Sequence, residues 1–498
     1  CQLAAGLSAI GIVAGTPVGI LMPNCPAYPE VYFAVLMAGG LVVNLNPLLA
    51  PEEIARQAEA SHSQVVVTLD APLLLQKLVP AMSNGCVARV IVAERRQLVS
   101  GLRAMLAWTQ AAFEDRGWRS DHRFLPLRSL LREPQPKRIA GTPDDVAVVQ
   151  FTGGTTGQPK AALLTHANLY ANAVQLTRWL GERDYDGVRL LAVLPFFHAF
   201  GMTGVMNFAI ALRASMLLVP RFDVTAILKA IDSGPPTIFV GVPAMYRALV
   251  EHPGFARTRG ASLKLCVCGG DPLDPSVRQR FEARISAPLI EGYGLTECSP
   301  VVACGSLALP LKPGTAGLPL PGTSIAITDP ADRSRMLAPG QTGEILVKGP
   351  QVMKGYLGAS EDSAGLLPDG WLPTGDLGFL DTEGYLHLVG RLKDMLTVRG
   401  HHVYPEAIEL VLRGYAGIAD AAVLGIPDPR SGESTIRAII VLGAGTKYDE
   451  GDLRHYLSQR LARHEMPDSI VIVAALPKSP LGKTQRSALH SILSSTGA

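Results

Sequence analysis

Short apolar segments with the length of strands alternate with helical segments along this chain. In the first part, apolar runs and helical patterns follow one another at 17–22, 27–38, 41–45, 51–60 and 63–69. Such alternation predicts a largely parallel sheet covered by helices. The pattern resumes after residue 140, with strand-like runs at 146–151, 190–194, 215–219, 237–240 and 263–267. An α/β fold is therefore expected, interrupted at 95–135 by a basic stretch with the character of an insertion.

The chain changes character near residue 315. Between 315 and 390, short strand-like runs are divided by Gly and Pro turns, which predicts a β-rich subdomain. A chain of 498 residues is too long for one ordinary core. The charged segment RLKDMLTVRG precedes a compact α+β pattern. We therefore expect a large N-terminal domain over 1–390, a hinge over 391–400 and a small mobile α+β domain over 401–498.

Composition excludes several classes of protein. Hydrophobic residues make up 48% and charged residues 18%, which is typical of a globular chain rather than a disordered one. The net charge of +2 gives no support for a large nucleic-acid-binding face. The longest uncharged apolar stretch, 31–43, is too short to span a bilayer. We expect a cytoplasmic protein with reduced cysteines, whose membrane contact, if any, is peripheral.

The segment 151–160, FTGGTTGQPK, follows an apolar strand-like run. Glycines allow backbone N–H groups to approach phosphate oxygens, hydroxyl groups add donors, and a lysine adds positive charge. Taken alone, a Gly-rich surface turn is the more frequent interpretation. It is not a Walker A motif, because Pro159 separates the last glycine from the lysine. The candidate phosphate contacts are Thr152, Gly153, Gly154, Thr155, Thr156, Gly157 and Lys160.

A second segment, EGYGLTECSP at 291–300, combines an aromatic ring, a hydroxyl and a carboxylate around two glycines. A purine could stack on Tyr293. Glu297 could hold Mg²⁺, which prefers oxygen ligands and substrate phosphates. Alone, Glu297 is more simply interpreted as an exposed carboxylate.

Two further segments carry charged residues in suggestive places. WLPTGD at 371–376 and GRLKD at 390–394 supply Asp376 and Arg391, a carboxylate and a guanidinium suited to vicinal ribose hydroxyls. A salt-bridged domain edge is the alternative. LPKSPLGKTQR at 476–486 places Lys483 in a Gly-containing loop, where an ordinary surface lysine is the alternative.

These segments occur together in one order, with PFFHAFG at 195–201 between the first two. In that order, and over essentially the whole chain, the sequence resembles the adenylate-forming (AMP-binding) superfamily. That superfamily includes acyl-CoA synthetases, adenylation domains of peptide synthetases and luciferases. Three features are most similar to bacterial long-chain fatty acid–CoA ligases: the two-glycine form of the loop, the phrase EGYGLTECSP and the extra segment at 95–135.

The resemblance implies a two-step reaction with ATP, Mg²⁺ and coenzyme A. In the first step a carboxylate attacks the α-phosphorus of ATP and releases pyrophosphate, and in the second the thiol of coenzyme A displaces AMP. It implies catalytic roles for Lys483, His198, Thr296 and Glu297, with Glu297 and Thr152 at the metal. Lys393 is implied at a hinge whose rotation moves the C-terminal domain between steps. Besides the loop, the implied cofactor contacts are Gly269, Gly270, Glu291, Gly292, Tyr293, Gly294, Asp376, Arg391, Lys393 and Gly400.

The sequence also departs from the family pattern. Ala161 stands where a glycine usually follows the loop lysine, and His402 stands where an asparagine is usual near the loop that faces coenzyme A. The chain starts at Cys1 within an expected helix, so we expect a truncated N-terminal subdomain. The two substitutions affect the expected efficiency more than the type of reaction, and the expected truncation is the more serious departure.

The expected acid is a medium- to long-chain fatty acid. The expected pocket walls are apolar, at Val205, Phe208, Val240, Gly241 and Met245, and Gly241 is expected to leave an open floor. No aspartate near PFFHAFG is available to pair with an amino acid's ammonium group. Alternatives are an acyl-AMP ligase that loads a carrier protein and a non-catalytic nucleotide- or acyl-binding protein. A homodimer is a further possibility, and no nucleic-acid partner is expected.

Overall fold

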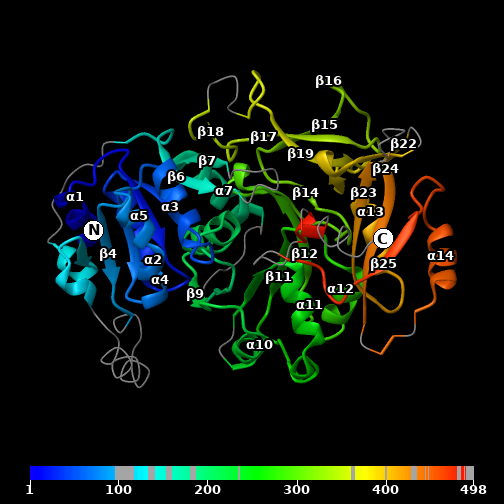
Figure 1. The fold of residues 1–498 in the computed structure, drawn as a ribbon, viewed down its shortest axis with the longest axis horizontal. Helices are drawn as coiled ribbons and strands as arrows, with labels where there is room; N and C mark the ends of the chain where they lie inside the picture. The colour runs from blue at the N-terminus through cyan, green and yellow to red at the C-terminus, as the bar shows by residue number, and fades with distance from the viewer. Residues whose placement is uncertain are drawn as a thin grey trace.

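The computed structural model describes most of the chain. The described ranges are 1–95, 117–132, 141–152, 160–179, 187–233, 236–359, 365–398, 401–427, 434–443, 445–446, 448–478, 484–486 and 488–489. Figure 1 shows the N-terminal elements at one end, a second helix-covered sheet in the middle, and the C-terminal elements at the opposite end.

The first sheet, sheet A, contains eight strands in the order β18-β7-β6-β2-β1-β3-β4-β5. The pairs from β6 through β5 are parallel, and β7 and β18 add antiparallel strands at the other edge. The strands are β1 (Pro17–Leu21), β2 (Leu41–Asn44), β3 (Val65–Leu69), β4 (Arg89–Ala93), β5 (Phe124–Pro126), β6 (Val146–Phe151), β7 (Ala161–Thr165) and β18 (Gly355–Tyr356). The accompanying helices are α1 (Gln2–Ala9), α2 (Ala27–Met37), α3 (Pro51–Ala60), α4 (Pro72–Lys77), α5 (Val79–Ser83) and α7 (His166–Trp179).

The central strands of sheet A are apolar on both faces because both faces are covered. In β1, β3 and β4 every residue after the first is buried, as expected for parallel strands between helices. The helix α3 begins with Pro51 and carries Glu52 and Glu53 in its first turn. Proline is preorganised for that position, and carboxylates there favour the positive end of the helix dipole.

The stretch 95–135 does not lie wholly outside the sheet, as an insertion would. Residues 96–116 and 133–140 are outside the described ranges. Between them, 3₁₀ turns at Gly117–Ser120 and Leu127–Leu130 flank β5. β5 pairs in parallel with β4 and extends sheet A by one edge strand. The described part therefore belongs to the sheet, which corrects the expectation for these residues.

The second sheet, sheet B, has seven strands in the order β14-β13-β12-β11-β10-β8-β9. Its strands are β8 (Arg189–Ala192), β9 (Ser215–Leu218), β10 (Ile238–Gly241), β11 (Leu265–Gly269), β12 (Leu289–Gly294), β13 (Val301–Cys304) and β14 (Leu318–Pro319). Between β8 and β9 lie α8 (Ala199–Gly201), a π-helical turn at Met202–Asn207 and α9 (Phe208–Ala211). The other helical segments are α10 (Val224–Ser233), α11 (Pro243–Glu251), α12 (Pro275–Glu282) and 3₁₀ turns at Pro253–Arg257 and Thr296–Cys298.

Sheet C is the β-rich region that the Gly and Pro turns predicted. Its order is β16-β15-β17-β19-β20 and each pair is antiparallel. The strands are β15 (Ser324–Asp329), β16 (Asp332–Met336), β17 (Gly343–Lys348), β19 (Leu372–Leu380) and β20 (Leu386–Arg391). A 3₁₀ turn at Leu392–Asp394 follows β20.

The C-terminal elements form a smaller unit with its own core. The elements are β21 (Leu396–Val398), β22 (His401–Val403), α13 (Pro405–Arg413), β23 (Ile418–Pro427), β24 (Ser434–Leu442), α14 (Glu450–Ser458) and β25 (Ser469–Ile472). β23, β24 and β25 form one sheet, and β21 pairs with β22. A separate cluster of buried side chains, including Val403, Ile408, Ile436 and Leu453, fills this unit. The predicted fold class, an α/β chain with a β-rich region and a small α+β end, is confirmed.

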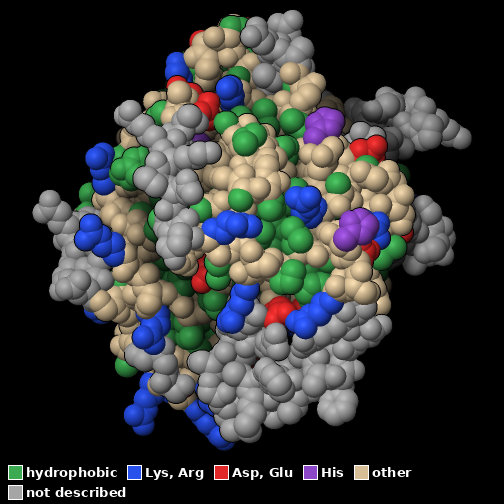
Figure 2. Space-filling model, turned by 90° about the vertical axis from the view of Figure 1, so that its left-hand side faces the viewer, with side chains coloured by type: hydrophobic (Ala, Val, Ile, Leu, Met, Phe, Trp, Pro, Cys, Tyr) green, Lys and Arg blue, Asp and Glu red, His purple; other side chains and the backbone are tan. Residues whose placement is uncertain are grey.

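One end of the molecule is seen in Figure 2, which turns the left-hand side of Figure 1 towards the viewer. Lys and Arg side chains lie singly on this face, among apolar side chains and neutral atoms. They do not merge into one basic stripe among the described residues. This dispersal agrees with the small net charge of +2.

Candidate active site

The predicted phosphate loop connects the hairpin strands β6 and β7. Thr152 N–H donates to the carbonyl oxygen of Lys160 at 2.8 Å, and the Thr152 hydroxyl donates to the same oxygen at 3.2 Å. These bonds close the base of the loop. Residues 153–159 lie outside the described ranges, so the predicted roles of Gly153, Gly154, Thr155, Thr156 and Gly157 stay predictions. Ala161 is the first residue of β7 and is buried there opposite Phe151.

Tyr356 connects the loop lysine with the predicted magnesium carboxylate. Its hydroxyl donates to Glu297 Oε1 at 2.7 Å, and Lys160 Nζ lies 4.9 Å from the centre of its ring. Tyr356 reaches this place because β18 pairs with β7, with Tyr356 opposite Ala162. Burial, and then the charge of Glu297, raise the pKa of Tyr356 well above its ordinary value. The hydroxyl therefore stays protonated and continues to donate.

Glu297 fits the requirements of a magnesium ligand. Within the described chain, only Oε1 accepts a hydrogen bond, so Oε2 remains available. The described residues contain no group of three or more His, Cys, Asp or Glu side chains that could form a metal cage. Magnesium in nucleotide sites typically uses one or two carboxylates together with substrate phosphates. Thr152, the second predicted metal contact, uses its hydroxyl hydrogen on Lys160 and keeps oxygen lone pairs free.

Tyr293, Asp376 and Arg391 come together from three strands, as the nucleotide prediction requires. The Tyr293 hydroxyl donates to Asp376 Oδ2 at 2.7 Å, and Arg391 Nε lies 3.3 Å from Asp376 Oδ1. Asp376 and Arg391 are direct partners across β19 and β20. Burial and the charge of Asp376 raise the pKa of Tyr293 well above its ordinary value. Only 7% of Tyr293 is exposed, so its visible role is to orient Asp376, and purine stacking stays a prediction.

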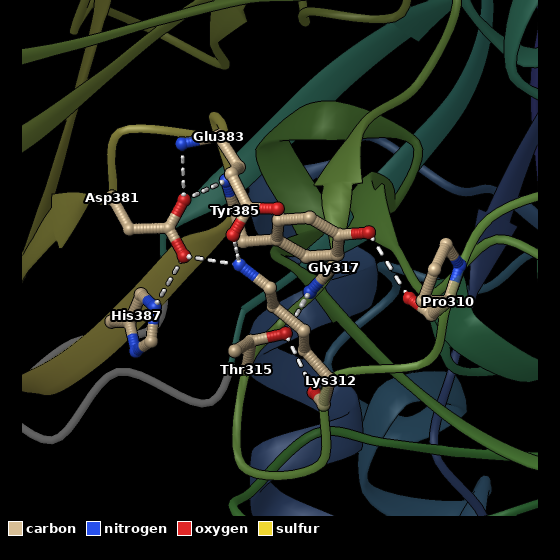
Figure 3. A network of polar contacts seen from close by, with 8 residues as sticks. All are labelled: Pro310, Lys312, Thr315, Gly317, Asp381, Glu383, Tyr385 and His387. Atoms are coloured by element: carbon tan, nitrogen blue, oxygen red, sulfur yellow. Dashed lines mark hydrogen bonds and ion pairs between the residues drawn. The ribbon is translucent and has the colours of Figure 1, made fainter.

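A polar network holds the β19–β20 hairpin against the loop that connects β13 to β14 of sheet B (Figure 3). Lys312 forms ion pairs with Asp381 and Glu383 and lies 4.4 Å from the centre of the Tyr385 ring. Asp381 Oδ1 accepts from the backbone N–H groups of Glu383 and Tyr385 at 2.9 Å. Burial opposes ionisation of Asp381, yet these bonds and that from His387 hold its pKa below the ordinary value. The network fixes the strands that present Asp376 and Arg391.

Glu291 serves the protein's own structure rather than offering a free carboxylate. Arg278 Nη2 donates to Glu291 Oε1 at 2.9 Å. The backbone N–H groups of Leu273 and Gly314 donate to its two oxygens at 3.2 Å. The side chain thus joins the loops around residues 273 and 314 to β12. A nucleotide contact from this residue would come more readily from its backbone.

The predicted glycines lie where β11 and β12 approach other segments closely. A Cβ atom at Gly294 would lie 2.1 Å from the carbonyl oxygen of Pro300, so no larger residue fits without movement. Gly270 has a φ of +95°, which favours glycine. Gly269 and Gly292 face each other across parallel strands. These glycines are explained by packing and by backbone geometry at the carboxyl end of the sheet, where ligands bind in open α/β folds.

His198 begins α8 directly after the turn that follows β8. Its ring lies 4.7 Å from that of Phe197 and is half-buried. Thr296 opens the 3₁₀ turn that presents Glu297. Both residues therefore lie in the segments that carry the predicted site, and their catalytic roles stay predictions.

The segment around the predicted hinge is joined to the last described residues by ion pairs. Arg486 lies 3.5 Å from Asp394, 3.3 Å from Glu406 and 2.9 Å from Glu409. Burial lowers the pKa of Lys393. The positive charges of neighbouring arginines lower this pKa further, whereas the negative charge of Asp394 raises it. Lys483 and Gly400 lie outside the described ranges. Arg486 follows Lys483 by three residues, and its ion pair with Asp394 places Arg486 beside the predicted hinge.

Comparison with known protein families decides the affiliation. Residues 1–357 match the AMP-binding enzyme family, and residues 407–483 match the AMP-binding enzyme C-terminal domain. The chain belongs to the AMP-binding enzyme family. A long-chain-fatty-acid–CoA ligase of Bacillus subtilis (strain 168) is 36% identical over 97% of this chain and 87% of its own length. A feruloyl-CoA synthase from an Amycolatopsis species is 34% identical over 97% and 90%, respectively.

The structure of ATP-bound MatB from Rhodopseudomonas palustris is 29% identical, with a TM-score of 0.85 over 99% of this chain and 91% of that one. The resemblance predicted from the ordered motifs is thus confirmed. This AMP-binding enzyme is an AMP-forming acid–CoA ligase that uses ATP, Mg²⁺ and coenzyme A. Among the helices of the described ranges, none has the length and apolar character needed to cross a bilayer.

Tyr356 and the ion-pair cluster at Arg486 were not found by sequence reasoning. Tyr356 stands 59 residues from Glu297, and no local pattern in KGYLG marks it as a partner. Only the pairing of β18 with β7 reveals the contact. Arg486 was noted as part of a motif, whereas its three carboxylate partners come from other segments.

Proposed function

We propose that this enzyme activates a medium- to long-chain fatty acid to its acyl-CoA thioester. The observation that carries the proposal is that the predicted pocket wall consists of apolar side chains that share one core cluster. Val205, Phe208 and Val240 are at most 5% exposed and belong to one core cluster, against which Met245 packs. An acyl chain is recognised by such a wall, and each buried methylene contributes up to about 0.8 kcal/mol.

Two further observations support an uncharged acyl tail. The segment 199–212, AFGMTGVMNFAIAL, contains no carboxylate to pair with a substrate ammonium group. Burying an unpaired charge is costly. The fatty-acid ligase of B. subtilis is also a relative of this chain.

One expectation about the pocket is corrected by the structure. A Cβ atom at Gly241 would lie 3.1 Å from both Phe239 Cζ and Tyr246 Cε2. The space beside Gly241 is therefore filled by ring edges and is not an open floor. A second candidate is an aromatic acid, which the relationship to a feruloyl-CoA synthase supports.

The proposed residue roles follow the charge that develops in each step. In the first step a carboxylate oxygen bonds to the α-phosphorus while the bond to the β-phosphate oxygen breaks. We assign charge stabilisation to Lys160 and Lys483, the metal to Glu297 with Thr152, and the ribose to Asp376. Mg²⁺, when bound, neutralises phosphate charge. In the second step sulfur bonds to the acyl carbon, the thiol proton is lost and AMP leaves, after rotation at Lys393.

The test is acid-dependent release of pyrophosphate across acetate, fatty acids of increasing length and ferulate, with and without coenzyme A. We expect kcat/KM to rise with chain length and then level off, with the thioester formed only when coenzyme A is present. A maximum at acetate would refute the proposal, and a maximum at ferulate would establish the second candidate. Formation of acyl adenylate without any thioester would favour the carrier-protein alternative.

A matched pair of variants locates the pocket. Val240→Phe adds bulk to the proposed wall and should shift the optimum to shorter acids. Val193→Phe adds the same bulk to the separate core cluster on another side of sheet B and should leave the optimum unchanged. Equal profiles in the two variants would contradict the assignment of the wall.

A further inference from the structure

A chain of hydrogen-bonded polar side chains crosses the core between sheets A and B. The Tyr28 hydroxyl donates to Asn44 Oδ1 at 2.7 Å, and Asn44 Nδ2 donates to Gln150 Oε1 at 2.8 Å. Gln150 Nε2 then donates to the carbonyl oxygen of Phe197 at 2.9 Å. None of Tyr28, Asn44 and Gln150 is more than 2% exposed. Because buried polar groups are costly when unpaired, this chain specifies one arrangement of the groups that it joins.

Gln150 and Phe197, whose carbonyl oxygen accepts the hydrogen bond from its side chain, lie in different parts of the candidate site. Gln150 is in β6 of sheet A, two residues before Thr152, where the phosphate loop begins. Phe197 follows β8 of sheet B and immediately precedes His198. One buried amide thus connects the strand that leads into the phosphate loop with the peptide that carries His198.

The start of the same segment is anchored separately by Asn24. Its Nδ2 donates to the carbonyl oxygens of Ala192 at 3.1 Å and Leu194 at 2.9 Å. Its Oδ1 accepts from the Phe196 N–H at 2.8 Å. Asn24 therefore holds residues 192–196, and the Gln150 bond adds the contact next to His198. Gln150 therefore adds a separate side-chain contact to the last part of the segment.

We propose that Gln150 is a positioning residue for adenylation. Through the Phe197 carbonyl it sets the distance between the His198 segment, where the acid's carboxylate is placed, and the end of β6 at Thr152. This inference rests on the proposed function, in which the acid lies beside His198 and ATP beside Thr152 and Lys160. In-line attack needs reacting atoms about 3–3.5 Å apart, and a misplacement of about 1 Å can cost roughly 100-fold in rate.

The first test compares two buried glutamines. Gln150→Leu removes the amide and should lower kcat for acid-dependent ATP–pyrophosphate exchange about 10- to 100-fold, with the KM for ATP changed by less than about threefold. Gln175→Leu is the matched control. Gln175 is 4% exposed, and its amide donates to the carbonyl oxygen of Pro321 and to Gln351, both of which lie outside the His198 segment. With both variants' folded fraction checked by thermal unfolding, the control should keep kcat within about threefold of wild type.

The second test uses a conservative variant whose donor depends on pH. In Gln150→Glu, a protonated carboxyl can still donate to the Phe197 carbonyl, whereas an ionised one only accepts. The ratio of Gln150→Glu to wild-type activity should therefore rise as the pH is lowered from about 9 to about 6, since buried Glu can titrate in this range. A general packing defect would not produce that rise.

The outcomes separate the two levels of the proposal. Wild-type exchange that responds to no acid would refute the proposed function itself. An active wild type with a Gln150→Leu variant of similar kcat, or with equal losses in Gln150→Leu and Gln175→Leu, would overturn only the role of Gln150. If Gln150→Leu does not fold, the Gln150→Glu profile decides, and a flat activity ratio overturns the proposal.

Discussion

Asp376 permits a quantitative test, because its contacts show how many ligand bonds it can still accept. Among the described residues, each of its two oxygens has one side-chain partner, Tyr293 at 2.7 Å and Arg391 at 3.3 Å. An ionised carboxylate offers about four lone-pair positions, so about two remain for a ligand. Two vicinal ribose hydroxyls would use them. The side chain is 15% exposed, so these bonds would form in a partly desolvated place.

Asp376→Asn keeps the shape and one acceptor oxygen but loses the charge and the second acceptor. A hydrogen bond to a charged group contributes about 1.5–3 kcal/mol. Loss of one such bond predicts a decrease of roughly 10- to 150-fold in kcat/KM for ATP. Tyr293→Phe removes only the orienting hydroxyl and should have a smaller effect, because both carboxylate oxygens stay available.

The assay is acid-dependent pyrophosphate release with ATP and with 2′,3′-dideoxy-ATP. Wild type and Tyr293→Phe should prefer ATP, whereas Asp376→Asn should lose most of that preference, since the missing contact is the one that the analogue also lacks. An Asp376→Asn variant that distinguishes the two nucleotides as strongly as wild type would place the ribose elsewhere. That conclusion would hold even if the overall activity had fallen.

Three further variants test other parts of the site. Lys483→Ala should slow adenylation by about two to three decades and spare thioester formation from preformed acyl adenylate, because one transition-state contact is lost; equal losses in the two half-reactions would contradict its role. Glu297→Gln should weaken the response of ATP use to Mg²⁺, and an unchanged titration curve would exclude Glu297 as a ligand. Glu409→Gln tests the buried cluster, where burial raises the pKa of Glu409 to about 7. Between about pH 4.5 and about pH 7, the folded protein therefore keeps a proton on Glu409 that the unfolded chain releases. The free energy of unfolding of wild type should fall relative to that of Glu409→Gln as the pH rises through this range. A constant difference between the two free energies would refute this expectation.

The fold class could be predicted from the amino-acid sequence, and so could the type of reaction, from the order of the motifs. Strand-like runs alternating with helices predicted the parallel part of sheet A, and the run at 146–151 coincides with β6. Glycines, hydroxyls and a lysine at 151–160, directly after a strand-like run, predicted a phosphate loop. These features can be found in the sequence because hydrophobic periodicity and backbone freedom act over neighbouring residues.

Which distant side chains lie in contact depends on the tertiary structure. Tyr356 joins Lys160 to Glu297 because β18 adds to the edge of sheet A. The carboxylate of Glu291 is held by Arg278, and ring edges fill the space expected to be open beside Gly241. Gln150 lies in an apolar run with no signal of a role, yet it bonds to Phe197, 47 residues away. Such contacts depend on strand order and on packing between sheets, which are set by interactions across the whole chain rather than by any one segment.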